Sequence, residues 1–269
     1  MQRYLDRNIK DLIAEFPEAG TALQARGIAC VSCGAGTCRL RDIVSMHNLA
    51  PAEETSLMRA LALAIDPAGN LAVPAPAPRA RPAGGPKYSP PLKRLVAEHA
   101  LIKSVLAALP AFLAGTDPAS PAGAARTRNV IRFIRSYADR HHHAKEEEIL
   151  FRLFDPALDV LKAMLQEHES GRSHVRAAEA ALDSGNGPGA AAALLAYREL
   201  LLDHIKKEDE VLYPWMDRNL SMKQVGNLSQ SFAEADALAP ADEIAACERI
   251  AAELGAFRPP SQPGTKLGH

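Results

Sequence analysis

Apolar residues recur at helical spacing along most of this chain. The pattern is clear in residues 9–16 and returns in 41–47 and 52–65, as expected of short helices that each bury one face. Residues 1–66 are therefore predicted to form a small helical domain. A loop rich in glycine and cysteine lies between its helices.

The next segment, residues 67–90, is dense in proline, alanine and glycine. Proline lacks a backbone donor, and this composition favours extended, solvated backbone. We therefore predict a linker. At its end Ser89 is followed by Pro90 and Pro91, which is typical of a helix start because the first helical amides need no partner within the helix.

Four amphipathic helices with short connections are predicted after the linker. They cover, in order, residues 90–113, 124–154, 156–182 and 190–219. An antiparallel four-helix bundle over residues 91–220 buries the apolar faces of all four. Residues 221–257 are predicted to add a C-terminal helical extension, and residues 258–269 a disordered tail. No stretch alternates apolar and polar residues as a strand does, so the predicted fold class is all-α.

The composition narrows the classes of partner. The chain has 269 residues, a net charge of −1 and a pI near 6.8, which give no global electrostatic reason to bind nucleic acid or an anionic membrane. Small molecules or proteins are the expected partners. The first residues lack the pattern of a signal peptide, and by sequence we expect no apolar run long enough to span a bilayer. A cytoplasmic location is predicted, and a homodimer is one alternative for the oligomeric state.

Each predicted bundle helix carries one histidine within its apolar stripe. These histidines are His99, His142, His168 and His204. A single histidine on such a face is most often a core residue that hydrogen-bonds to a neighbour. Four on consecutive helices are different, since a dry bundle core penalises each polar group that lacks a partner. A shared metal site would satisfy them together.

An internal repeat identifies the carboxylates that accompany two of these histidines. Residues 142–151, HHAKEEEILF, align without gaps on residues 204–213, HIKKEDEVLY. The alignment sets Glu146 over Glu208, each four residues after its histidine and therefore on the same helix face. By the same alignment His141 and His143 flank the site, and we expect them to be exposed or packed beside it.

The number and type of these side chains favour a pair of ions. Four imidazoles and two carboxylates exceed what one tetrahedral zinc ion needs, and the stripes contain no cysteine. Two ions bridged by Glu146 and Glu208 fit the count and leave coordination positions open. Mixed nitrogen and oxygen ligation suits non-haem iron, with zinc or manganese as alternatives. The Glu-x-x-His tetrad of ferritin-like bundles is absent.

Residues 92–219 resemble a hemerythrin-type HHE domain. The motifs are EH at 98–99, HHAKEEEILF at 142–151, EH at 167–168 and HIKKEDEVLYPW at 204–215. The resemblance implies that two iron ions are bound, with both glutamates bridging, by His99, His142, Glu146, His168, His204 and Glu208. Oxygen-carrying hemerythrins have a further histidine one turn after the third-helix ligand, where this chain has Arg172. That difference favours chemistry or iron exchange over reversible oxygen carriage.

The cysteine loop is the second candidate for chemistry. Cys30, Cys33 and Cys38 lie among glycines, and three interpretations stay open: a reversible disulfide, a metal site completed by an outside ligand such as His47, or packing alone. Cys247 is expected to be a small buried residue.

The whole arrangement is similar to the Repair of Iron Centres (RIC) di-iron family, although that family has adjacent cysteines where this chain reads CVSCG. The resemblance implies a stress-response protein that restores damaged iron–sulfur clusters by donating iron or removing nitric oxide. Cys30 and Cys33 would then take part in redox or iron transfer, and damaged iron–sulfur proteins would be the partners. The alternative is a module that binds or senses oxygen or nitric oxide without turnover. Glu98 and Glu167 are expected to be exposed, or else to orient an imidazole.

Overall fold

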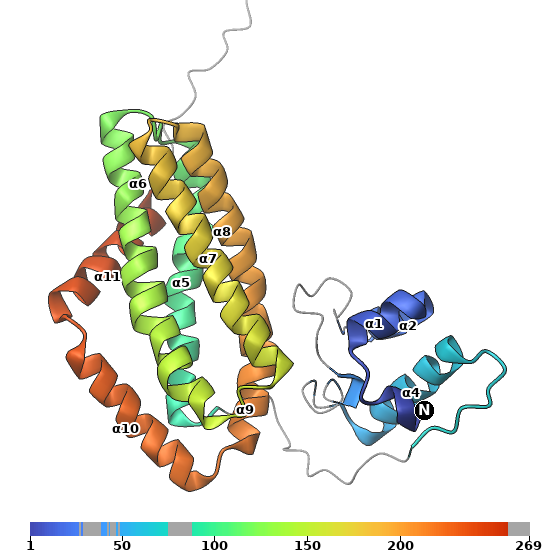
Figure 1. Ribbon diagram of the computed structural model, residues 1–269. Helices are drawn as coiled ribbons and strands as arrows, with labels where there is room; N and C mark the ends of the chain where they lie inside the picture. Colours follow the sequence, from blue (N-terminus) through green and yellow to red (C-terminus); the bar gives the residue numbers. More distant parts are fainter. Residues whose placement is uncertain are drawn as a thin grey trace, which may run out of the picture. The chain divides into compact units, whose positions relative to one another are not determined.

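The computed structural model describes residues 1–26, 28, 39–41, 43, 47, 49–74 and 88–257 (Figure 1). The chain divides into two compact units. The first comprises residues 1–89 with 154–165 and 207–222, and the second comprises residues 90–153, 166–206 and 223–269. Cys30, Cys33 and Cys38, much of the predicted linker and the predicted tail 258–269 lie outside the described residues.

The N-terminal unit is helical. It contains the 3₁₀ turn η1 (Gln2–Tyr4) and the helices α1 (Ile9–Glu15), α2 (Pro17–Gln24) and α4 (Pro51–Ile65). The Asn8 side chain accepts a hydrogen bond from the Lys10 amide and so caps α1. Leu12, Leu23 and Leu61 are fully buried in its own apolar core.

The bundle follows the predicted order of helices. Its elements are α5 (Pro90–Ala114), α6 (Pro121–Phe133) with its continuations η2 (Ile134–His143), η3 (Glu146–Leu150) and η4 (Phe151–Leu153), then α7 (Asp159–Asp183), α8 (Gly187–Lys207), η5 (Glu208–Leu212) and α9 (Tyr213–Asn219). Figure 1 shows the long helices running side by side. The described residues contain one isolated β-bridge and no named strand. The all-α prediction is confirmed.

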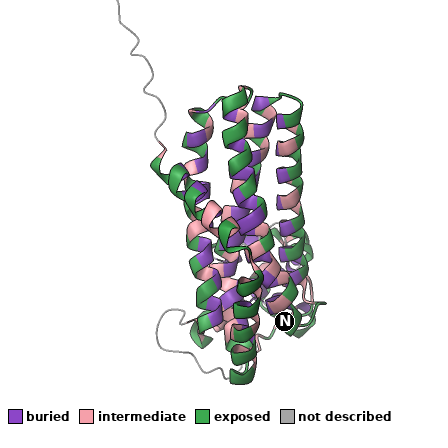
Figure 2. Cartoon of the chain, turned by 90° about the vertical axis from the view of Figure 1, so that its left-hand side faces the viewer, coloured by how far each residue is buried: buried purple, intermediate pink, exposed green. Residues whose placement is uncertain are grey.

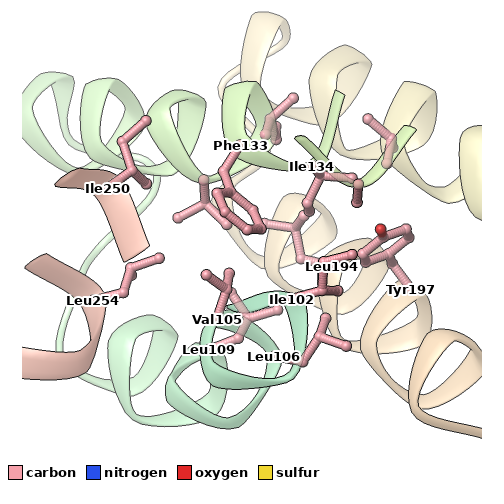
Figure 3. Packing of buried hydrophobic residues seen from close by; sticks show 14 of the residues in the cluster. Ile102, Val105, Leu106, Leu109, Phe133, Ile134, Leu194, Tyr197, Ile250 and Leu254 are labelled. Carbon is pink, nitrogen blue, oxygen red and sulfur yellow. The ribbon is translucent and has the colours of Figure 1, made fainter. Parts of the chain in front are cut away.

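Two further helices extend the bundle. They are α10 (Met222–Leu238) and α11 (Ala241–Ala256), and α11 packs against α5 and α6. Ile250 and Leu254 of α11 join the main apolar core, close to Val105 and Phe133 in Figure 3. Cys247 is fully buried in the same core, as the sequence predicted.

Burial follows the faces of the helices. In Figure 2 the buried residues form stripes that face inward and the exposed residues face outward. Leu95 and Ile102 of α5 and Leu161 of α7 are buried. Leu165 is 41% exposed, because it lies beside the buried face of α7 rather than on it.

The second bundle helix differs from the prediction of one continuous α-helix. Most of its C-terminal part consists of π-helical turns, η2 and η3. The fourth helix likewise continues into a third π-helical segment, η5. π turns close with i→i+5 hydrogen bonds and occur often at functional sites. Here η2 ends at His143, η3 begins at Glu146 and η5 begins at Glu208. The 3.6-residue period therefore fails where the candidate ligands lie.

The first bundle helix corrects one sequence expectation. Among the described residues, α5 alone is long and apolar enough to cross a membrane by length and composition. A core helix of a bundle meets the same criteria, and α5 carries the buried polar residues Glu98 and His99. The finding goes no further than the properties of this helix.

Two neighbouring leucines of α8 test the packing of the bundle. Leu194 is fully buried in the main core and Leu195 is 37% exposed. We expect Leu194→Ala to lower the free energy of unfolding by about 2–5 kcal/mol, because it leaves a cavity. Leu195→Ala should change it by less than about 1 kcal/mol. Urea denaturation of both variants measures the difference, and equal losses would contradict the assigned faces.

Candidate metal centre

A layer of ionisable side chains is buried across the bundle. Each of the following residues is at most 5% exposed: His99, His142, His143, Glu146, His168, His204 and Glu208. They come from α5, η2, η3, α7, α8 and η5. Burying this many imidazoles and carboxylates is costly unless they are paired or bind a cation.

These side chains form two groups whose ligand atoms lie within 4.8 Å of one another. The first group is His143, Glu146, His168 and His204, and the second group is His99, His142, Glu146 and Glu208. Glu146 belongs to both, which is the position of a carboxylate that bridges two ions. Glu208, predicted as the other bridge, occurs in the second group alone.

The distances within the groups suit metal ligands. His168 Nε2 lies 3.0 Å from His204 Nε2, and two nitrogens that bind one ion at right angles with bonds of about 2.1 Å lie about 3 Å apart. Glu146 Oε2 is 3.5 Å from His168 Nε2 and 3.7 Å from His142 Nε2. One carboxylate oxygen therefore faces an imidazole of each group.

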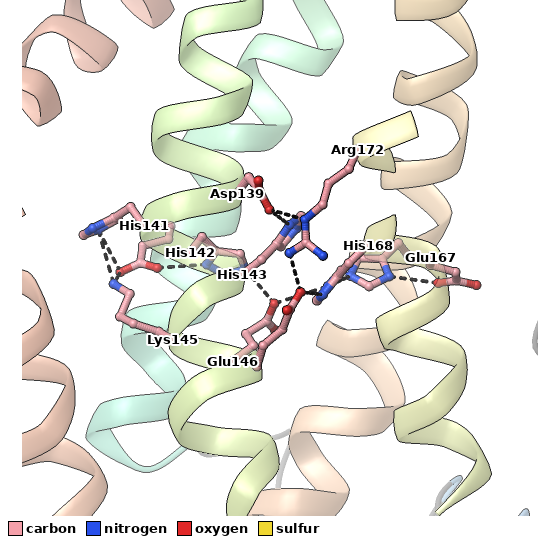
Figure 4. A network of polar contacts seen from close by, with 12 residues as sticks. Asp139, His141, His142, His143, Lys145, Glu146, Glu167, His168 and Arg172 are labelled. Atoms are coloured by element: carbon pink, nitrogen blue, oxygen red, sulfur yellow. Dashed lines mark hydrogen bonds and ion pairs between the residues drawn. The ribbon is translucent and has the colours of Figure 1, made fainter. Parts of the chain in front are cut away.

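In three of the histidines a carboxylate contacts Nδ1, the ring nitrogen on the side away from the other ligands. His142 Nδ1 is 2.8 Å from Glu98, His168 Nδ1 is 2.7 Å from Glu147, and His204 Nδ1 is 2.8 Å from Glu167. Figure 4 labels His142, Glu146, Glu167 and His168 within this network. A carboxylate at Nδ1 fixes the proton on that nitrogen and turns the Nε2 lone pair toward the site.

The fixed tautomers indicate what the centre accommodates. If His168 and His204 both donate their Nδ1 protons to carboxylates, two Nε2 lone pairs face each other at 3.0 Å, and they repel unless a cation lies between them. His142 Nε2 is buried with no hydrogen-bond partner among the described residues. Burial and the neighbouring His99 lower the pKa of His142 to about 3, so its imidazole is neutral. The donor set fits metal ions.

Comparison with known families agrees with this geometry. The family model described as the hemerythrin HHE cation-binding domain matches residues 80–216. The chain belongs to this family. No curated protein and no solved structure matches the sequence.

The HHE domain brings together all six residues that the sequence predicted as ligands. His99, His142, Glu146, His168, His204 and Glu208 each occur in one of the two groups. Their assignment as ligands of bound ions stays a prediction, because it needs measured metal binding. The candidate thiols, Cys30 and Cys33, lie outside the described residues.

One residue of the HHE domain lies closer to the candidate site than the sequence argument placed it. His143 was expected outside the site, yet it is buried and belongs to the first group. The repeat alignment could not reveal this, since the matching residue in the fourth helix is Ile205. His141 does lie away from both groups, where its Nε2 is 3.2 Å from Lys145 Nζ.

The expectation of solvent exposure was also wrong for Glu98 and only partly right for Glu167. Glu98 is 7% exposed, and its carboxylate contacts His142 and the Lys145 ammonium. Burial acts to raise the pKa of the Glu98 carboxyl, but hydrogen bonds from His141 and His142 and the charge of Lys145 hold it well below its usual range. The sequence signal that pointed to a role for these two glutamates was their position, since each directly precedes a predicted ligand.

The C-terminal extension reaches this network through Asp236 of α10. Lys145 Nζ is 2.9 Å from Asp236 Oδ1, and Arg94 forms an ion pair with the same carboxylate. Lys145 itself is 2% exposed, so Glu98 and Asp236 together supply the counter-charge that a buried ammonium requires. The contacts link α10 to the back of the His142 ring through Glu98.

A pocket of about 140 Å³ opens beside the first group. Its lining includes Asp139, His143, His168, Arg172 and Tyr197. Tyr197 is buried, and its hydroxyl has no hydrogen-bond partner among the described residues. Burial raises the pKa of Tyr197, so the hydroxyl keeps its proton and can donate it to a small polar ligand.

Metal binding should stabilise the wild-type domain and depend on His204. At about 100 times its dissociation constant, an ion that binds only the folded state adds about 2.7 kcal/mol of stability. We expect His204→Ala to lose most of this gain, because one of the paired Nε2 atoms is gone. His174→Ala, which removes a histidine outside both groups, should keep it. Thermal melts with and without ferrous iron measure the gain.

The carboxylates behind the imidazoles should affect metal affinity without touching the ions. Glu167 contacts His204 Nδ1, whereas Glu169, two residues further along α7, is exposed and pairs with Arg176. We expect Glu167→Ala to weaken metal binding about 10–100-fold and Glu169→Ala to leave it unchanged. Metal competition titrations compare the two, and equal affinities would show that Glu167 does not orient His204.

Proposed function

We propose that this HHE domain holds two non-haem iron ions and acts under nitrosative or oxidative stress, where it helps to restore damaged iron–sulfur clusters by donating iron or removing nitric oxide. The observation that carries the two-ion part is the shared position of Glu146 in both ligand groups. The repair part is supported by the resemblance of the sequence to the RIC family.

Iron is favoured by the donor atoms. Both groups offer imidazole nitrogen and carboxylate oxygen and contain no thiolate, a set that suits non-haem iron, with zinc and manganese as the alternatives. When bound, such a pair of ions supplies a redox-active site with open positions for a diatomic ligand. Glu98, Glu147 and Glu167 keep three of the imidazoles in the tautomer that binds metal.

Access of a small ligand is supported by the pocket beside the first group. Its volume of about 140 Å³ is enough for a diatomic molecule or a few waters. A ligand that enters passes the positively charged Arg172 and can accept a hydrogen bond from the Tyr197 hydroxyl. These features suit nitric oxide or oxygen better than a large substrate.

A second candidate function is a module that binds or senses oxygen or nitric oxide without turnover. The contacts from His142 through Glu98 and Lys145 to Asp236 favour it. A change of charge at the centre would alter the ion pair between Glu98 and Lys145. It would thereby change the contact between Lys145 and Asp236, which holds α10. The extension could then report the state of the centre to a partner protein.

Reaction with nitric oxide separates the two functions. The iron-loaded, reduced protein is mixed with excess nitric oxide in a stopped-flow instrument, with an electron donor present, and added afterwards to an enzyme whose cluster has been damaged. For repair we expect either consumption of several equivalents of nitric oxide or recovery of the damaged enzyme. Both activities should fall at least about 10-fold in Glu146→Ala, since that change removes the ligand common to both groups.

The opposite result is equally clear. Binding of nitric oxide in fixed proportion to iron, without further consumption and without recovery of the enzyme, would reject the repair function and leave the sensing module. Metal analysis of the wild-type protein must give close to two ions per chain in either case. One ion per chain would reject the bridged centre itself.

A further inference from the structure

We propose that His143 is a ligand of the ion held by His168 and His204, so that this ion has three imidazoles while the other has two. The inference rests on the proposed two-ion centre. It assigns a metal-binding role to a residue that the ligand set implied by the family resemblance does not include.

The position of His143 is that of a ligand rather than a neighbour. Its ring nitrogen lies within 4.8 Å of the ligand atoms of Glu146, His168 and His204. The ring stacks on His168 with a centroid distance of 3.9 Å, and it meets His204 edge-on at 5.9 Å. Binding of one ion by both stacked rings therefore requires them to tilt apart, which a rotation of the His143 ring provides. A histidine that served only to pack the core would not need to bring a ring nitrogen among three other metal-binding atoms.

A carboxylate lies beside His143, as one lies beside each of His142, His168 and His204. Asp139, one turn earlier on η2, has its Oδ1 3.7 Å from His143 Nδ1. Arg172 Nε donates a hydrogen bond of 2.9 Å to the same oxygen and so fixes the carboxylate. Asp139 therefore faces the His143 ring from the side away from the other ligands, at a distance longer than the 2.7 Å contact between Glu147 and His168.

The same arginine explains why a ligand from η2 is needed. Arg172 lies one turn after His168, where a further imidazole would otherwise reach the ion from α7. A guanidinium stays protonated and has no lone pair to offer a metal, and Arg172 is also bound to Glu147 at 2.6 Å. His143 approaches the ion from the neighbouring helix and restores the number of imidazoles on that side.

The internal repeat makes the two ions unequal. The residue that matches His143 in the fourth helix is Ile205, which is 2% exposed and belongs to the apolar core. The second group contains His99 and His142 as its imidazoles, whereas the first contains three. The ion of the first group should therefore be the harder of the two to remove, and His143 should account for part of that difference.

The test compares variants by anaerobic titration with ferrous iron, followed by metal analysis and an optical spectrum. We expect His143→Ala and His143→Gln to weaken binding of one of the two ions at least about 10-fold, with the other ion unchanged, and to alter the spectrum. His174→Ala is the control, because this histidine belongs to none of the candidate ligand groups. Circular dichroism of the metal-free proteins establishes that each variant keeps its helices.

A second-site change makes the test specific. In the double variant His143→Ala with Arg172→His, an imidazole is returned from α7, and we expect two ions and tighter binding than in His143→Ala alone. Loss of packing at position 143 would not be repaired in this way.

Two results would overturn the inference, and they differ from each other. If folded His143→Ala and His143→Gln bind two ions with wild-type affinity and spectrum, His143 is a packing residue and the two-ion centre stands without it. If the wild-type protein itself binds no more than one ion, the proposed centre fails and the role of His143 fails with it.

Discussion

The structure depends on one constraint, which is that imidazoles and carboxylates buried in a helical bundle need cations among them. Glu98, Glu147 and Glu167 contact the outer nitrogens of three histidines, and this arrangement turns the remaining lone pairs inward. Inward lone pairs only 3.0 Å apart are unfavourable in the empty protein and become favourable when an ion separates them. The energy of metal binding is thereby coupled to the energy of folding, and Glu146 joins the two halves of the centre because it belongs to both.

The rest of the bundle supplies rigidity around this layer. Leucines, isoleucines and phenylalanines of α5, α6, η2, α8 and α11 form a continuous core, so the helices that present the ligands cannot slide independently. Lys145 connects the polar layer to the C-terminal extension. Its ammonium is buried between Glu98 and Asp236, where loss of either carboxylate would leave an uncompensated charge. The C-terminal extension is therefore part of the electrostatic support of the centre as well as part of its apolar cover.

The sequence allowed much of this to be predicted. The order of the helices followed from periodicity, and the six predicted ligands followed from single histidines in apolar stripes together with a gapless internal repeat. His143 was placed beside the site because the gapless repeat matches it to Ile205 of the fourth helix, and a residue without a polar counterpart in the repeat gives no such signal. The burial of Glu98 was missed because its partner, Lys145, lies 47 residues away in sequence. Such pairings are set by tertiary packing, and no local pattern records them.

Arg172 shows how a change at one ligand position alters its surroundings. An arginine in place of an imidazole brings a permanent positive charge next to the centre, and it is tolerated here because Asp139 and Glu147 both accept hydrogen bonds from it. Each of those carboxylates also faces a histidine of the first group. The arginine thus fixes the two carboxylates that face His143 and His168. It also lines the pocket through which a small ligand reaches them. The space beside the first group is therefore lined by charged and hydrogen-bonding groups that a diatomic ligand or small anion must pass.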